Sequence, residues 1–331
     1  MSYRIRVQPS GHVFASEARE SILEAGLRSG LNLRYHCKNG SCGQCAVRVR
    51  SGVVQAGCPP DFNLPDADRA AGWVLSCCVR AASDLEIEAG ETTDAADIPE
   101  QKLTAKVSKL ERVDADTLIL HLRTPRSRTL RFLAGQQVQL QLPDGASRSL
   151  PLASCPCDGM NLSCHVHHDP TDGFSHYLFS RLKNREQLEL VGPRGTFTLD
   201  EEVRRPLLFI AAETGFAPVE SLIEHAIALE WEPPISLYWL SGRPGGHYLG
   251  NYCRSWVDAL DDFHYQGMKL QPAGQLDLAA ALQTIVEQVP GLEKRDVYAA
   301  VSERHGPELR GRLLQAGLPA PQLHLETLEH L

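Results

Sequence analysis

The 331-residue sequence lacks three features that would place it in a special class of proteins. No apolar run is long enough to span a bilayer, so the sequence predicts no membrane span. The net charge is −8 and the charges are spread along the chain, which argues against a nucleic-acid-binding protein. The chain also starts directly with strand-like residues 3–7 and shows no signal peptide, so we expect a cytoplasmic protein.

Cysteine, by contrast, is plentiful, with ten residues in the chain. Cys37, Cys42 and Cys45 stand at C-x4-C-x2-C spacing, which is the plant-type arrangement for a [2Fe–2S] cluster. Thiolates are soft ligands that suit iron–sulfur clusters. Gly40 and Gly43 allow this loop to turn tightly, so that backbone N–H groups can point at the inorganic sulfurs. The spacing therefore predicts three cluster ligands and requires a fourth from far along the chain.

We expect the fourth ligand within residues 74–78, where Cys77 and Cys78 are adjacent. Cys77 is preferred because C-x5-Ser83-Asp84-Leu85 resembles the closing segment of plant-type ferredoxins. Cys78 is the alternative, since neighbours on a strand face opposite ways. A zinc site or structural thiols are the other interpretations, but zinc usually takes two short Cys or Cys/His pairs and no second pair lies nearby. The remaining cysteines are expected to be reduced thiols.

Residues 1–92 are expected to form a β-grasp ferredoxin domain, followed by a polar linker at 93–100. Alternating or short apolar patterns predict strands at residues 3–7, 12–14, 45–49 and 85–88. A helical pattern covers residues 17–29 and ends at Gly30. This order of elements resembles a plant-type ferredoxin, which carries one electron at a time.

Residues 101–200 are predicted to form an all-β sandwich or barrel. Short strands separated by turn signals are expected at residues 103–107, 117–122, 138–142, 162–166 and 187–191. Four stretches resemble the flavin-binding barrel of the ferredoxin–NADP reductase family, namely residues 132–138, 143–148, 173–175 and 192–197. Together with its neighbouring domains, the chain resembles the subgroup with an N-terminal ferredoxin, which includes oxygenase reductases and the CDP-6-deoxyglucoseen reductase type.

The resemblance implies that an Arg-x-Tyr-Ser/Thr motif holds FAD, and this chain has Arg148-Ser149-Leu150-Pro151 instead. Arginine pairs with phosphate through its fork of donors. Leu150 replaces the ring that would stack on the flavin, and Pro151 replaces the hydroxyl that would bond to it, so we expect weak flavin binding.

Gly173-Phe174-Ser175 opens a helical segment and resembles the turn that seats the flavin pyrophosphate, where a helix N-terminus favours anions. His165, Val166 and His167 align with the strand that lines the flavin in the family. His165 and His167 share one face of that strand, so a metal site is geometrically possible. No carboxylate pattern supports a metal there, so the flavin role is preferred.

Residues 201–331 are predicted to form a doubly wound parallel sheet that binds its ligand at the carboxyl ends of the strands. Buried strands are expected at residues 206–212, 235–240 and 296–300, with helices from about 216 to 231 and over 276–289. The first of these helices is expected to carry Pro218 near its first position. The family binds a pyridine nucleotide in this domain.

Ala212-Glu213-Thr214-Gly215 stands where the family has Gly-Gly-Thr-Gly. Thr214 and Gly215 keep the family's residues, whereas Glu213 places a carboxylate where phosphates should lie. We expect this carboxylate to fold back onto the donors of the following helix N-terminus and to weaken nucleotide binding.

Ser241 and Arg243 follow the second strand, where relatives that prefer NADPH often bind its 2′-phosphate. The family's cysteine near the nicotinamide is absent from residues 300–303, and residues 325–328 lack the aromatic residue that many relatives place over the flavin.

The resemblance implies a multidomain enzyme of α+β and α/β type that passes electrons from NAD(P)H through FAD and a [2Fe–2S] cluster to a protein partner. That partner would be an oxygenase or a dehydratase-type enzyme. A flavin is needed because nicotinamide moves two electrons together while the cluster accepts one. The alternative is a degenerate reductase that keeps the cluster, has lost flavin or nucleotide binding, and acts as an electron carrier or docking scaffold.

Overall fold

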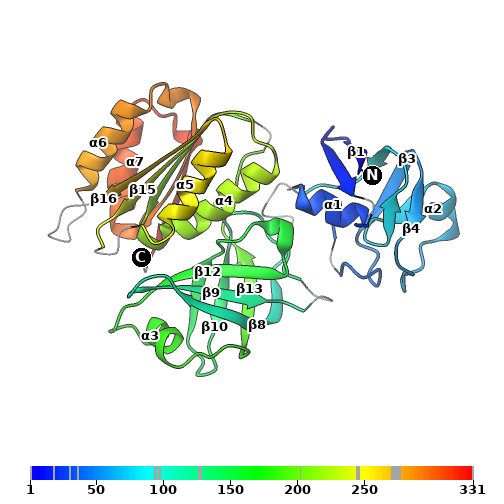
Figure 1. Cartoon of the computed structure of the whole chain (residues 1–331), viewed down its shortest axis with the longest axis horizontal. Coiled ribbons are helices and arrows are strands. Elements are labelled where there is room, and N and C mark those ends of the chain that lie inside the picture. Colours follow the sequence, from blue (N-terminus) through cyan, green and yellow to red (C-terminus); the bar gives the residue numbers. More distant parts are fainter. Residues whose placement is uncertain are drawn as a thin grey trace.

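The computed structural model of the chain contains three domains, and Figure 1 shows the N-terminal domain set to one side of the other two. The structure describes residues 2–17, 19–29, 31–35, 37–92, 95, 98–125, 129–201, 203–243, 247–269 and 277–329. Within these ranges, no helix is both long enough and apolar enough to cross a membrane.

The N-terminal domain has a five-stranded sheet in the order β2-β1-β7-β3-β5 and a separate pair of strands, β4 and β6. β1 runs parallel to β7 and antiparallel to β2, as a β-grasp domain requires. The helix α1 buries Ile22, Leu23 and Leu27 in the core of this domain. Its elements are β1 (Ser2–Gln8), β2 (Val13–Glu17), α1 (Ile22–Arg28), β3 (Ala46–Ser51), β4 (Val54–Ala56), α2 (Asp66–Ala70), β5 (Trp73–Leu75), β6 (Val79–Ala81) and β7 (Leu85–Glu88).

The helix predicted over residues 17–29 is shorter than expected, because Glu17 ends β2 and α1 begins at Ile22. A capping box sets this start. Ser21 Oγ accepts a hydrogen bond from the Glu24 backbone N–H at 3.2 Å, and the Glu24 carboxylate accepts one from the Ser21 N–H at 2.8 Å. These bonds satisfy two of the donors that a helix N-terminus leaves free.

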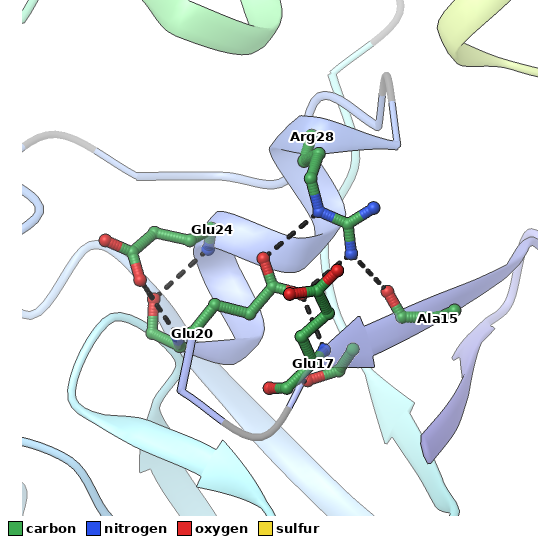
Figure 2. Close-up of polar contacts among 7 residues, drawn as sticks. Ala15, Glu17, Glu20, Glu24 and Arg28 are labelled. Atoms are coloured by element: carbon green, nitrogen blue, oxygen red, sulfur yellow. Dashed lines mark hydrogen bonds and ion pairs between the residues drawn. The ribbon is translucent and has the colours of Figure 1, made fainter. Parts of the chain in front are cut away.

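Arg28, at the other end of α1, holds the helix against β2, as Figure 2 shows. Its guanidinium donates to both carboxylate oxygens of Glu20, at 3.1 and 2.7 Å. It also donates to the Ala15 carbonyl oxygen at 2.7 Å. The position of α1 beside the cluster loop is therefore set by contacts at both helix ends.

The middle domain is a six-stranded antiparallel sheet in the order β11-β10-β13-β8-β9-β12. Its outer strands β11 and β12 contact each other, so the sheet nearly closes into the expected barrel. All five predicted strands form, and β11, which the strand patterns did not indicate, carries the Arg148 motif. The elements are β8 (Gln101–Arg112), β9 (Thr117–Arg123), β10 (Gln137–Gln141), β11 (Ser147–Pro151), η2 (Pro156–Asp158), β12 (Asn161–His167), α3 (Gly173–Ser180) and β13 (Gln187–Arg194).

The C-terminal domain is a parallel five-stranded sheet in the order β16-β15-β14-β17-β18, with helices on both faces. Its strands are β14 (Leu207–Ala212), β15 (Ile235–Ser241), β16 (Phe263–Lys269), β17 (Asp296–Ser302) and β18 (Leu323–Leu328). Its helices are α4 (Phe216–Ala228), α5 (Gly250–Ala259), α6 (Leu278–Gln288) and α7 (Gly306–Gln315), with short 3-10 turns at η3 (Glu213–Gly215), η4 (Leu292–Lys294), η5 (Glu303–His305) and η6 (Ala320–Gln322).

Successive residues of β14 face opposite layers of this domain. Phe209 and Ala211 pack with the core that includes α4, whereas Leu208 and Ile210 pack with the core that includes α6 and α7. A strand buried on both faces reads as a continuous apolar run, which is why the sequence pattern located it.

The patterns misplaced the end of α4 and overlooked both outer strands of the sheet. The expected helix to Trp231 ends at Ala228, and Pro218 lies two residues after its start. In β16 and β18 only the first residues, Phe263 and Leu323, are buried, and each strand has a neighbour on one side only. Edge strands of this kind lack the continuous apolar run on which the prediction depended.

Candidate functional site

The cluster loop meets a thiol from a distant part of the chain. Cys45 Sγ and Cys77 Sγ lie 3.2 Å apart, although the two residues are far apart in the sequence. Cys37 and Cys42 lie on the same loop and influence each other's pKa. Gly40 and Gly43 have positive φ angles of 80° and 75°, so the loop uses the left-handed conformations for which glycine was expected.

Cys77 and Cys78 lie in the turn between β5 and β6, not on a strand as expected. Their sulfurs lie 3.7 Å apart. Cys78 Sγ is 2.7 Å from the sulfur of Cys58 and lies against Gly40, where an added Cβ would come within 2.6 Å of it. Cys77 Sγ is paired with Cys45 of the loop at 3.2 Å, whereas Cys78 Sγ is paired with Cys58, which the sequence patterns did not single out.

The loop favours thiolates at two of its positions. Burial works against ionisation of Cys37, but hydrogen bonds from Ser41, Asn39 and Cys42 outweigh it and lower the pKa of the Cys37 thiol to about 6. A hydrogen bond shared with Cys77 lowers the pKa of Cys45 to about 7, and the same bond together with burial raises the pKa of Cys77. The thiolate is the form that binds metal.

No three Cys, His, Asp or Glu side chains in the described ranges surround one point closely enough to hold a single metal ion. Cysteine thiolates are the ligands by which proteins hold [2Fe–2S] clusters.

A second site is a cavity of about 380 Å³ between the barrel and the C-terminal domain. Eight of the residues expected to bind cofactors line it, namely Arg148, Ser149, Leu150, Pro151, His165, Val166, His167 and Thr214. Residues of the C-terminal strand end, Thr327 and Leu328, close one side of it. The remaining expected residues, Gly173, Phe174, Ser175, Gly215 and Arg243, do not line this cavity.

Asp172 occupies the donors that were expected to receive a phosphate at the barrel. Its Oδ1 lies 2.5 Å from Arg148 Nη2, and its carboxylate accepts from the backbone N–H groups of Phe174 at 3.4 Å and Ser175 at 2.8 Å. Burial favours the neutral form, but the hydrogen bonds from Arg148 and Ser175 hold the pKa of Asp172 well below its usual range. The sequence analysis did not consider Asp172, although an Asp directly before a helix is a common N-cap.

His165 and His167 lie on β12 but have different partners. His165 Nδ1 is 2.9 Å from the Tyr248 hydroxyl, and its Nε2 is 3.3 Å from Glu220 Oε2 on α4. Burial lowers the pKa of His165 to about 3, so this imidazole is neutral at pH 7. His167 Nδ1 instead lies 3.1 Å from the Asp116 carbonyl oxygen.

Glu213 does not fold onto the N-terminus of α4 as expected, but reaches the loop after β15. Its Oε1 accepts from the Gly242 N–H at 2.7 Å, and its Oε2 accepts from Ser241 Oγ at 3.1 Å. Arg243 Nε lies 3.2 Å from the same Oε2. The carboxylate therefore takes the residues proposed for a 2′-phosphate, and it leaves the N-terminus of α4 free of this side chain.

Gly215, the retained glycine of this motif, lies where β17 passes the turn. A Cβ at this position would come within 2.5 Å of the Ala300 carbonyl oxygen. Only glycine allows so close an approach between the turn and the neighbouring strand, so Gly215 sets the path of the chain into α4.

The N-terminal domain contacts the barrel through its cluster loop and α1. Lys38 and Asn39 line a cavity of about 820 Å³ together with Cys157 and Asp158, which belong to the connection between β11 and β12. The Lys38 ammonium lies 5.0 Å from the ring centre of the buried Tyr35. The cluster loop thus faces the segment that joins the two strands lining the first cavity.

Comparisons with known proteins give separate family matches for the N-terminal domain and the barrel. Residues 5–82 match the 2Fe-2S iron-sulfur cluster binding domain family, and residues 104–199 match the oxidoreductase FAD-binding domain family. The chain is 32% identical over 305 residues to the CDP-6-deoxy-L-threo-D-glycero-4-hexulose-3-dehydrase reductase of Yersinia pseudotuberculosis, covering 91% of each protein. It is 31% identical over 267 residues to terephthalate 1,2-dioxygenase reductase component 1 of a Comamonas species, covering 80% of this chain and 78% of that protein.

Two solved structures share its fold. The Amycolatopsis cytochrome P450 reductase GcoB is 26% identical, with a TM-score of 0.63 over 98% of both chains. Phthalate dioxygenase reductase is 20% identical, with a TM-score of 0.57 over 68% of both chains, and this match supports the fold alone.

Proposed function

Since the chain belongs to the ferredoxin–NADP reductase family with an N-terminal [2Fe–2S] domain, we propose that it passes electrons from NAD(P)H through FAD and the cluster to a partner enzyme. FAD, when bound, would supply the means to accept two electrons from a nicotinamide and to pass them on singly, which a one-electron cluster requires. The partner is an oxygenase or a dehydratase-type enzyme, as the names of the relatives indicate.

The observation that carries this proposal is the meeting of Cys45 and Cys77 at 3.2 Å, which adds a distant thiol to the loop. We assign the four cluster ligands to Cys37, Cys42, Cys45 and Cys77. The number and softness of these thiols fit a [2Fe–2S] cluster. Cys78 is the weaker choice because its sulfur lies beside Cys58 and behind Gly40.

The residues around the barrel cavity fit FAD, but they suit its pyrophosphate better than its flavin ring. Arg148 and the start of α3 supply a guanidinium and backbone N–H groups, which suit a pyrophosphate. Leu150 and Pro151 line the cavity where the flavin ring belongs, and they offer an apolar surface without stacking or a side-chain hydrogen bond. We therefore propose that the chain binds FAD loosely.

The C-terminal domain fits a pyridine nucleotide at the carboxyl ends of β14 and β15. Thr214 is buried beside the cavity, and Gly215 lets the chain turn directly into α4, whose N-terminus favours a pyrophosphate. Arg243 lies at the adjoining loop, where it is paired with Glu213. The nicotinamide end of the ligand would then point toward Thr214 and the flavin side of the cavity.

The arrangement of the N-terminal domain suits transfer from the barrel to the cluster. A single stretch of backbone runs from Pro151 on the flavin side to Cys157, which shares a cavity with Lys38 of the cluster loop. We propose that this connection brings the flavin side of the barrel near the cluster loop. None of the ten cysteines forms a disulfide, which supports a reducing compartment such as the cytoplasm.

A second candidate function is a carrier that keeps the cluster but lacks a working flavin or nucleotide site. The carboxylates of Asp172 and Glu213 favour it, because both occupy donors that suit phosphates. The two functions differ in one spectrum. A reductase purified with added FAD shows flavin absorption over the broad cluster bands, whereas the carrier shows the cluster bands alone.

The decisive experiment is anaerobic reduction of the FAD-loaded protein by NADH and by NADPH, followed by absorption. We expect the flavin bands and then the cluster bands to bleach with at least one nucleotide. Dithionite serves as the control, since it reduces the cluster directly. Bleaching by dithionite with no response to either nucleotide would reject the reductase function and leave the carrier.

A further inference from the structure

We propose that Glu213 makes the nucleotide site selective for NADH over NADPH. This inference rests on the proposed function, since it concerns which nucleotide the same site accepts. It starts from the contacts of Glu213 with the loop after β15, which differ from those expected for a residue in this motif.

Glu213 is held in place through its backbone as well as its side chain. It adopts a positive φ of 53°, an uncommon conformation for a residue with a side chain. Its carbonyl oxygen accepts a hydrogen bond from Trp239 Nε1 at 3.0 Å. Trp239 is itself fully buried and stacks on Phe216 with ring centres 4.0 Å apart. The turn is therefore fixed in the conformation that aims the carboxylate at the end of β15.

The carboxylate uses three donors of that loop at once. Gly242 N–H, Ser241 Oγ and Arg243 Nε all lie within 3.2 Å of its two oxygens. Arg243 is held from its other side as well, because its Nη1 lies 3.3 Å from Thr117 Oγ1 of the barrel. A hydroxyl, an amide and a guanidinium around one anion are the donor set that a phosphate monoester would need. Here the chain supplies the anion itself.

A 2′-phosphate brought to this loop meets a carboxylate instead of a free cation. The phosphate carries about −1.5 to −2 charges at pH 7. The side chains of Arg243 and Glu213 are only 15% and 19% exposed, so solvent screens the repulsion poorly. Arg243 is already neutralised by its partner. NADPH can therefore bind only after Glu213 is displaced.

NADH meets no such obstacle, because its ribose carries a 2′-hydroxyl at the same place. A hydroxyl can donate to a carboxylate, and an acidic residue in this role is the usual way a doubly wound domain recognises NAD. The pair of Glu213 and Arg243 thus favours the nucleotide without the extra phosphate.

The first test measures binding of 5′-AMP and 2′,5′-ADP to the FAD-loaded protein by titration calorimetry. These probes differ only in the 2′-phosphate. We expect wild type to bind 5′-AMP at least about tenfold more tightly. Glu213→Gln should tighten 2′,5′-ADP by about tenfold or more, because Arg243 is released. Glu308→Gln on α7 removes the same charge from an exposed ion pair of the same domain and should change neither affinity.

The second test compares anaerobic cluster reduction by the two nucleotides. Wild type should react faster with NADH, and Glu213→Gln should shift the ratio of rates toward NADPH. Wild type that binds 2′,5′-ADP as tightly as 5′-AMP and reacts equally with NADPH overturns the selectivity and leaves the reductase function intact. Failure of both nucleotides in both proteins, with normal reduction by dithionite, overturns the selectivity and the reductase function together.

Discussion

The cluster loop and the two phosphate sites of this protein are prepared for their ligands in different ways. In the cluster loop, Cys37 and Cys45 already have lowered pKa values, through Ser41 and Asn39 at Cys37 and through Cys77 at Cys45. At the barrel and in the C-terminal domain, the donors that suit phosphates are already engaged by Asp172 and Glu213. At the cluster loop no internal anion stands in the way, whereas a phosphate reaches the donors of the other two regions only by displacing a carboxylate.

The two phosphate sites also differ from each other. Asp172 accepts from backbone N–H groups at the start of α3 and stabilises the helix as its N-cap. Removing the Asp172 side chain would therefore destabilise the start of α3. Glu213 accepts from the loop of a neighbouring strand and holds a strained backbone conformation. Removing Glu213 relieves strain as well as charge. Phosphate binding should therefore be easier to restore at the nucleotide site than at the flavin site.

The largest expected effect is complete loss of the cluster. Cys77→Ser should lose the cluster, because Cys77 is the distant thiol that meets Cys45. Cys78→Ser is the matched control and should retain it. Iron and sulfide analysis with visible absorption checks both proteins. Retention of the cluster in Cys77→Ser with loss in Cys78→Ser would transfer the fourth ligand to Cys78.

The next effect concerns the nucleotide site. Restoring the family's glycines with Ala212→Gly and Glu213→Gly together should speed cluster reduction by NADPH by about tenfold or more, because charge repulsion and the positive φ are both relieved. Reduction by NADH should not gain, because its 2′-hydroxyl loses the carboxylate. Stopped-flow absorption under anaerobic conditions measures both rates. Rapid reduction of wild type by NADPH, unchanged by the double replacement, would show that Glu213 is no obstacle to this nucleotide.

Asp172→Ser tests whether Asp172 competes with the flavin phosphates, because serine keeps the N-cap and removes the charge. FAD and FMN should bind about tenfold more tightly, since Arg148 no longer has a competing carboxylate, while riboflavin should bind as it does to wild type. Quenching of flavin fluorescence provides the affinities. An equal gain for riboflavin would mean that Asp172 acts on the ring end and does not stand in for a phosphate.

The ring end should respond less. Leu150→Tyr with Pro151→Ser should tighten FAD by roughly 0.5–1.5 kcal/mol, which is the usual gain from an aromatic pair. Wild type should lose flavin on gel filtration and regain it with added FAD, and the double variant should keep more of it. A wild type that retains FAD through gel filtration would contradict loose binding.

The last effect is on stability and not on ligand binding. It is a pH dependence at Glu326, which accepts from Gln137 Nε2 at 2.7 Å. Burial raises the pKa of Glu326 from 4.5 to about 7, so the folded protein binds this proton more tightly than the unfolded chain. The resulting loss of stability is absent below pH 4.5 and grows as the pH rises to about 7.

Glu326→Gln removes this dependence and should stabilise the protein by about 1–2 kcal/mol at pH 8, after allowance for partial exposure. It should have little effect at pH 4.5, where the carboxyl group is neutral in the folded protein. Calorimetric Tm values at both pH values check the sign. An equal shift at both would assign the effect to packing.

Much of this protein was predictable because the relevant information is local in the sequence. The C-x4-C-x2-C spacing lies within nine residues, and its glycines adopt the expected left-handed turns. The buried strand β14 could be found from its apolar run alone, and the Arg148 motif lies on one short strand. Backbone turns, strand burial and ligand chemistry follow from neighbouring residues, so the fold class and the cluster could be inferred, whereas FAD and NAD(P)H were implied by the resemblance to the family.

Only the tertiary structure decided which groups satisfy the donors at each site. Cys45 meets Cys77 across 32 residues, Arg148 meets Asp172 across 24, and Glu213 meets Gly242 across 29. A carboxylate binds whichever donors the fold brings within reach, and a residue pattern does not contain those distances. The sequence therefore determined that Glu213 brings a negative charge to the nucleotide turn, and the packing of β14 beside β15 determined that this charge meets Ser241, Gly242 and Arg243.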